Sequence, residues 1–192
     1  LRIWFLPRPE GVERLGKRPD ATTIRLGALR DEDIRELVCR RLDVEDIPDQ
    51  LDTFIHLRAE GHPFFAEELS VALRDGGAVA IRDGTCRLTG DITELAAHLL
   101  PDTVQGIVAT RIDQLPPQQQ LTLKVAAILG RQFALGDLAT VHPLSLASDA
   151  LREHVRKISD AGLLISPADR DDRFSFSHAL VQEVAYEQLP YM

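Results

Sequence analysis

Pro116 and Pro117 divide the chain, because two consecutive prolines cannot lie within a helix or a central strand. Before this pair, residues 30–115 show apolar residues mostly at helical spacing. After it, residues 116–192 contain several short helical segments and two strand-like segments. The pattern therefore predicts a mainly α fold, with a boundary between two domains near Pro116.

The first residues of the chain predict strands, unlike the helical segments that follow. Residues 1–6 are apolar on both faces, as central strands of parallel sheets are, and residues 22–26 predict a second short strand. The chain starts at Leu1, directly inside the apolar run. We therefore expect it to be a piece of a longer protein.

Between residues 30 and 115, Gly and Pro residues separate the helical segments. An Asp-Gly pair, Asp83-Gly84, lies between two strand-like runs and predicts a hairpin. We expect helices from about Asp31, over 49–60, from Pro63 to Asp75 and from Thr103, with hairpin strands at 78–81 and 85–88.

The segment after Pro117 has a definite order of elements. The predicted elements are helices over about 118–129, 135–141, 147–160 and 179–189, with strands at 163–165 and 173–176. Three helices followed by a hairpin is the order of a winged-helix domain.

Charge and composition narrow the classes of function. The net charge of −8 argues against a general nucleic-acid binder, which needs clustered Lys and Arg. The two cysteines, Cys39 and Cys86, lack metal-type spacing and suit a reducing compartment. No apolar run approaches the length of a membrane span, so we expect a cytoplasmic protein without membrane contact.

Motifs for phosphate chemistry are missing from this sequence. It contains no Gly-x-x-x-x-Gly-Lys-Ser/Thr loop to hold phosphates, and no apolar strand ends in an acidic pair that would hold magnesium. We therefore expect no catalytic and no metal-binding residue in the chain.

Four blocks of sequence resemble the bacterial signal-transduction ATPases of the STAND class, of the kind related to AAA ATPases. The first block, Gly61-His62-Pro63-Phe64-Phe65-Ala66-Glu67-Glu68-Leu69, is similar to the family's Gly-Asn-Pro-Phe-Phe-x-Glu-Glu-Leu motif, with His62 in place of Asn. The other three blocks follow in the family's order, at residues 100–116, 126–133 and 176–186. Such modules are fused to class III adenylate or guanylate cyclases, serine/threonine kinases or LuxR-type regulators.

The resemblance implies an organisation and a role. Residues 1–29 would be the last strands of an α/β P-loop core, residues 30–115 a helical lid and residues 116–192 a winged helix. The P-loop would lie upstream and hold ATP or ADP with Mg, while this chain would bind no cofactor alone. The chain would close over the nucleotide and relay its state to a downstream effector or helical-repeat domain.

Three residues are candidates for contact with that nucleotide. Pro63 presents a flat apolar ring for packing against adenine, although a proline also simply suits the start of a helix. By the resemblance, Arg8 would reach the γ-phosphate and His178 the β-phosphate of ADP. The alternatives are a solvated loop arginine and a structural histidine.

For several other polar and aromatic residues we expect structural roles. Glu67 and Glu68 diverge around a helix, so they cannot share one site, and we expect both to act as first-turn charges on the helix dipole. Phe64 and Phe65 are expected in the core. Arg111 is expected to pair with Asp113 or with a carboxylate of the wing.

Two other functions remain open. A DNA-binding winged helix would read DNA with residues 147–160, but that helix is neutral, and residues 113–192 carry seven Lys or Arg against ten Asp or Glu. The other alternative is a protein-interaction scaffold that does not depend on a nucleotide.

Overall fold

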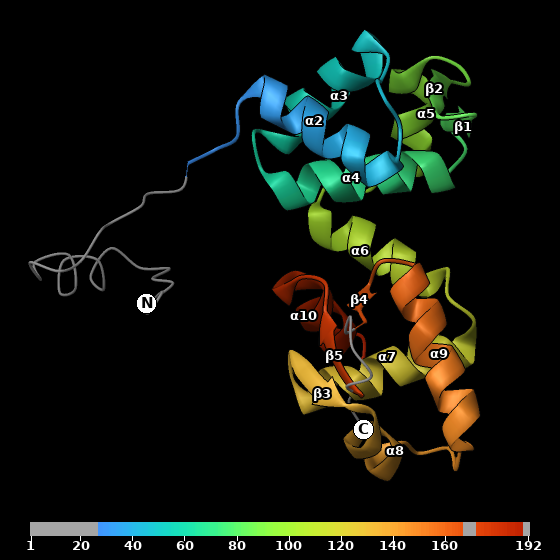
Figure 1. The fold of residues 1–192 in the computed structure, drawn as a ribbon. Helices are drawn as coiled ribbons and strands as arrows, with labels where there is room; N and C mark the ends of the chain where they lie inside the picture. The colour runs from blue at the N-terminus through green and yellow to red at the C-terminus, as the bar shows by residue number, and fades with distance from the viewer. Residues whose placement is uncertain (1–26, 167–171, 190–192) are drawn as a thin grey trace, which may run out of the picture.

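The computed structural model describes residues 27–166 and 172–189. Within these ranges the protein is mainly helical with two small antiparallel sheets, which confirms the predicted mainly α class. The elements form two groups joined by one helix, α6 (Figure 1). We call α2–α5 with β1 and β2 the first lobe, and α7–α10 with β3–β5 the second lobe. The strands expected at 1–6 and 22–26, and Arg8, lie outside the described residues.

The first lobe is built from α2 (Asp31–Leu42), α3 (Asp49–Ala59), α4 (Pro63–Asp75) and α5 (Ile92–Leu99). Apolar residues at helical spacing, such as Ile34, Leu51 and Leu69, are fully buried in one cluster. Arg35 ties α2 to the start of α3, because it binds Asp46, Asp49 and Asp52. The lobe is thus held by an apolar core with one ion-pair network at its edge.

The predicted hairpin is present as β1 (Val79–Arg82) and β2 (Thr85–Leu88). Asp83 and Gly84 both have positive φ, 50° and 70°, which is the backbone of the tight turns that match strand twist. Alternation along the strands buries Cys86 and leaves Arg82 and Arg87 exposed. The hairpin therefore covers the core of the first lobe with one face.

Helix α6 (Val104–Asp113) belongs to both lobes. Thr103 caps its N-terminus, because the Thr103 hydroxyl accepts a hydrogen bond from Gly106 N at 3.1 Å. Ile107 packs in the core of the first lobe, whereas Val108 and Ile112 pack in that of the second. The boundary predicted near Pro116 stays a prediction, and the two cores meet on α6.

The second lobe contains α7 (Pro117–Leu129), β3 (Gln132–Ala134), α8 (Leu135–Val141), α9 (Ser148–Asp160), β4 (Leu164–Ile165), β5 (Arg173–Phe176) and α10 (Ala179–Glu187). The sheet has the order β3-β5-β4 with antiparallel pairing throughout. On this sheet Phe133 lies within contact of Phe174 and Phe176, with ring centroids about 6 Å apart. The three rings join the sheet to the helical core.

A small polar cluster lies inside the second lobe. Thr122 is fully buried and donates its hydroxyl proton to Gln118 O at 2.8 Å. The same oxygen lies 3.1 Å from His142 Nε2 and 3.2 Å from His154 Nδ1. A hydroxyl has one proton, so both imidazole nitrogens donate to it. This cluster fixes α7 against α9 and the end of α8.

Candidate functional site

The junction between the lobes brings together Phe64 on α4 and His178 before α10. Their rings stack with centroids 3.9 Å apart and an interplanar angle of 11°. Phe64 belongs by sequence to the first lobe but packs against the apolar cluster of the second. Two of the sequence blocks singled out above, 61–69 and 176–186, therefore meet in space.

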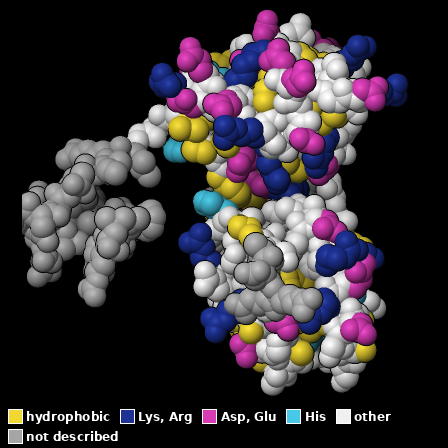
Figure 2. Space-filling model, in the orientation of Figure 1, with side chains coloured by type: hydrophobic (Ala, Val, Ile, Leu, Met, Phe, Trp, Pro, Cys, Tyr) yellow, Lys and Arg dark blue, Asp and Glu magenta, His cyan; other side chains and the backbone are white. Residues whose placement is uncertain are grey.

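The surface shows where this junction lies. Figure 2 shows the molecule narrowing between the lobes, with a notch whose walls expose histidine and hydrophobic side chains. Both Pro63 and His62 are exposed at the start of α4. Pro63 is the first residue of that helix, as predicted from its missing N–H. It lies next to Phe64 in the chain.

Gly61 fixes how the chain enters α4. Its φ of 74° is in the left-handed region, and a Cβ there would lie 2.6 Å from the Cβ of Ala28. Leu29 N donates to Gly61 O at 2.9 Å. The segment leading into α2 therefore passes against the start of α4, beside Pro63.

His178 is held by the backbone on one side and by Phe64 on the other. Its Nδ1 accepts a hydrogen bond from Leu180 N at 3.2 Å and so caps α10. This bond leaves Nε2 to carry the proton of the neutral ring. Burial lowers the pKa of His178, the positive charge of Arg131 lowers it further, and Glu68 and Glu183 oppose the shift.

The structure places the ring of His178 in the contact between the two lobes. The ring is half-buried at the junction because it caps a helix and stacks on Phe64. Of the three residues predicted at the nucleotide, the structure places His178 at this junction and Pro63 at the exposed start of α4, before Phe64 in the chain. Arg8 is outside the described residues, and contact of any of them with nucleotide stays a prediction.

A buried ion pair links α4 to α6 next to this junction. Arg111 Nη1 donates to Glu68 Oε2, and the two residues are 6% and 2% exposed. The prediction of Asp113 or a wing carboxylate as the partner of Arg111 is wrong. The partner lies 43 residues away in the chain, so the local spacing carried no signal for it.

The predicted role of Glu67 and Glu68 needs a correction. Neither lies in the first turn of α4, which contains no acidic residue because the helix begins at Pro63. Glu68 is the buried partner of Arg111, and Glu67 is half-buried. Burial raises the pKa of Glu67, with Glu68 adding to the shift and Arg41 opposing it. The prediction that they cannot share one site follows from their divergence and agrees with these different surroundings.

The exposed face of α9 carries no unpaired cation. Arg156 binds Glu153 and Asp160 at 2.8 Å, and Lys157 lies 3.5 Å from Glu153. Arg152 binds Asp172 at 2.7 Å. These pairs neutralise the helix that a DNA-binding winged helix would place in the groove.

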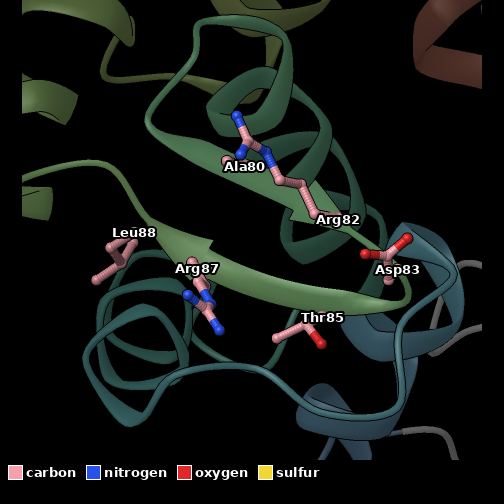
Figure 3. A pocket seen from close by; sticks show the side chains of 6 residues that line it. All are labelled: Ala80, Arg82, Asp83, Thr85, Arg87 and Leu88. Atoms are coloured by element: carbon pink, nitrogen blue, oxygen red, sulfur yellow. The ribbon is translucent and has the colours of Figure 1, made fainter.

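A second hollow lies on the outer face of the hairpin, far from the junction in the fold. It is an open depression of about 410 Å³ lined by Ala80, Arg82, Asp83, Thr85, Arg87 and Leu88 (Figure 3). The polar side chains that line it are exposed, and Figure 3 shows the two guanidinium groups pointing in different directions. The depression therefore lacks the convergent polar groups typical of a ligand site.

Over residues 27–166 and 172–189, no three His, Cys, Asp or Glu side chains are grouped so as to hold a metal ion. In the same ranges no helix has the length and apolar character needed to cross a bilayer.

Comparison with known proteins finds two partial similarities. A family model described as a domain of unknown function (DUF8739) matches residues 30–87, from the start of α2 into β2. Adenylate cyclase type 10 of Oryctolagus cuniculus is 42% identical over 53 residues, which is 28% of this chain and 3% of that protein. No solved structure matches the chain significantly.

Proposed function

We propose that this chain is the regulatory lid and winged-helix portion of a signal-transduction ATPase. It closes over ATP or ADP bound by an upstream P-loop core and relays the nucleotide state to an effector. The observation that carries this proposal is the stack of Phe64 on His178. It joins the two sequence blocks that resemble the family's nucleotide-facing motifs.

The architecture supports this proposal. In the second lobe the order of elements is helix, strand, two helices and two strands, with β5 between β3 and β4. This order resembles that of a winged-helix domain with a short first strand, and it supports the proposed assignment of residues 116–192 to such a domain. The first lobe, with its four helices and its hairpin, forms the proposed lid over residues 30–115 together with α6.

The path of the chain into α2 supports the proposal of an upstream core beside the start of α4. Leu29 binds Gly61, two residues before Pro63. A core attached through residues 1–29 would thus be tethered beside the exposed ring of Pro63 and the notch. ATP or ADP with Mg would be held by that core, and adenine would pack on Pro63.

His178 has the chemistry for sensing a phosphate. Its Nδ1 is occupied as an acceptor, so Nε2–H is the donor available to a ligand. Without a ligand, burial and Arg131 favour the neutral ring. A phosphate at Nε2 would favour the charged ring and strengthen the hydrogen bond. The contact would therefore exist in the nucleotide-bound state and be absent from the empty one, as a switch requires.

The output of the module follows from the same resemblance. The partial similarity to adenylate cyclase type 10 agrees with a cyclase as the effector. Kinases and transcription factors are the other effectors of such modules. The paired cations of α9 support nucleotide sensing over DNA binding. Nucleotide binding distinguishes the proposal from the scaffold alternative, because only the proposed module needs to bind ATP or ADP.

The test is ADP binding by a longer chain that includes the proposed P-loop core. We expect His178→Ala and Pro63→Ala to weaken ADP binding, the former by about tenfold or more, as expected for a hydrogen bond to a charged group. Pro117→Ala is the matched control, because Pro117 is also exposed at the first position of a helix. The 192-residue chain alone should bind ADP weakly or not at all.

The outcomes separate the parts of the proposal. No ADP binding by the longer chain would contradict the function itself and favour the scaffold. Full retention of ADP by His178→Ala would contradict the role of that residue. Micromolar ADP binding by the 192-residue chain would contradict the division between core and lid. A salt-dependent shift of duplex DNA would favour the DNA-binding alternative.

A further inference from the structure

Two arginines converge on the turn that ends α9. Arg111 Nη2 on α6 donates to Ala161 O at 2.5 Å. The guanidinium of Arg41, in the last turn of α2, lies against Gly162, since a Cβ added at Gly162 would be 2.7 Å from Arg41 Nη2. The first lobe and α6 thus contact the backbone of the second lobe at one turn.

The turn is a preformed acceptor for cations. Gly162 N donates to Ser159 O at 2.8 Å and Leu163 N to Ile158 O at 3.2 Å, which together form a Schellman motif. Gly162 has a φ of 74°, as this motif requires. The carbonyl of Ala161 is left outside the helical hydrogen bonds, at the negative end of the helix dipole. Cations placed there are stabilised by both effects.

Glu68 fixes the position of Arg111 within this contact. One guanidinium binds Glu68 with Nη1 and Ala161 O with Nη2, so α4 and the end of α9 are set relative to each other by the same planar group. A buried ion pair adds little net stability over apolar residues, but breaking it is costly. Its best-attested use is to select one arrangement of elements.

The contact continues to the candidate site. Leu163 O, next in the chain after the turn, accepts hydrogen bonds from Ser177 N and Ser177 Oγ, both at 3.1 Å. Ser177 precedes His178. A path of direct bonds therefore leads from Arg111 through the turn to the residue that stacks on Phe64.

We propose that Arg111 is a latch that holds the second lobe against the first. When Arg111 releases Ala161, the second lobe shifts relative to α6 and the first lobe, and the stack of Phe64 on His178 opens. Arg111 acts through the turn and Ser177, so it is a positioning residue for His178. The latch itself does not depend on a nucleotide, whereas its effect on nucleotide retention rests on the proposed function.

The test measures the distance between the lobes by double electron–electron resonance. Spin labels are attached at Thr85→Cys and Asp149→Cys, both exposed, after Cys39 and Cys86 are replaced by Ser and Ala. The decisive variant combines Glu68→Leu with Arg111→Met, which removes both buried charges and keeps apolar volume. We expect a longer and broader distance distribution while circular dichroism stays that of a folded protein.

Two further variants keep the test decisive. Arg35→Met breaks ion pairs that lie within the first lobe and should leave the distribution unchanged. Arg111→Lys keeps the charge but replaces the planar fork by a single ammonium, and it should also broaden the distribution. In Arg111→Lys the amide of Leu180 should exchange about tenfold faster, as loss of a charge-assisted hydrogen bond predicts.

An unchanged distribution in both the double variant and Arg111→Lys would overturn the latch. If the double variant does not fold, Arg111→Lys decides alone. All these measurements are made without nucleotide. Failure of the latch would therefore leave the ADP-binding test standing, and failure of ADP binding would leave the latch standing.

Discussion

Phe64 and His178 are stacked almost parallel, with ring centroids 3.9 Å apart. Phe64 is the second residue of α4 in the first lobe, and His178 caps α10 in the second lobe. The stack is therefore a direct side-chain contact between the lobes.

The stack makes the protonation of His178 depend on Phe64. In Phe64→Leu we expect the pKa of His178 to move up toward its ordinary value of 6.5, because burial is the main cause of its lowering. Loss of the aromatic pair should also cost about 1 kcal/mol of the free energy of unfolding. An NMR titration of the imidazole C–H signals measures the shift. Phe65→Leu is the control, since Phe65 packs in the other core, and an equal shift there would refute the dependence.

Stability should fall on mild acidification. Burial lowers the pKa of both His178 and His154, so the unfolded chain binds more protons than the folded one below about pH 6.5. Stability is thus highest above this value and decreases as the pH falls toward the lowered pKa values of the folded state. Urea midpoints between about pH 7.5 and about pH 5.5 test the sign. His178→Phe keeps a ring without titrating and should flatten the dependence, while a midpoint that rises on acidification would contradict it.

The local elements were readable from the sequence. Pro63 and Gly76 set the ends of α4, and the Asp83-Gly84 pair placed the hairpin turn. Strand β3 and helix α5 were not predicted. Strand β3 has only three residues and exists because it pairs with β5, far along the chain. Helix α5 has eight residues and begins at Asp91, whose side chain accepts bonds from Thr93 N and Glu94 N. Asp91, a typical N-cap residue, was the sequence signal from which the start of α5 could have been predicted.

The candidate site was predictable in part. The sequence singled out Pro63 and His178, and the structure places His178 at the junction and Pro63 at the exposed start of α4. The partner of Arg111 and the stacking of His178 on Phe64 were not predictable, because each joins residues from different helices. Such contacts are set by how the lobes pack, and a single sequence contains no periodicity that reports them.

The buried cluster around Thr122 should be costly to disturb. Thr122→Val removes the hydroxyl that accepts from His142 and His154, and His142 is only 8% exposed. We expect a loss of about 1–3 kcal/mol in the free energy of unfolding, because polar ring nitrogens are left without a partner. Thr140→Val is the matched control, since Thr140 also donates to the carbonyl four residues earlier but is exposed. That change should stay within about 0.5 kcal/mol. Equal losses in urea unfolding would contradict this account.

The close approach of Arg41 to Gly162 predicts an asymmetry between two glycines. Gly162 and Gly77 both have positive φ, 74° and 79°, but only Gly162 has a side chain within 4 Å of an added Cβ. Gly77→Ala should cost about 1–2 kcal/mol from its backbone conformation alone. Gly162→Ala should cost more, because the Arg41 guanidinium must move. A comparison of the two variants by thermal unfolding measures the difference, and equal costs would show that Arg41 moves away freely.

The central claim is that the junction at Pro63 and His178 faces a nucleotide held by an upstream core. Hydrogen–deuterium exchange of the longer chain, with and without ADP, tests this claim most directly. We predict slower exchange on ADP binding at residues 62–65 and at 178–181, with α9 and the hairpin β1–β2 unchanged. ADP binding that leaves the exchange at both of these segments unchanged would contradict the account.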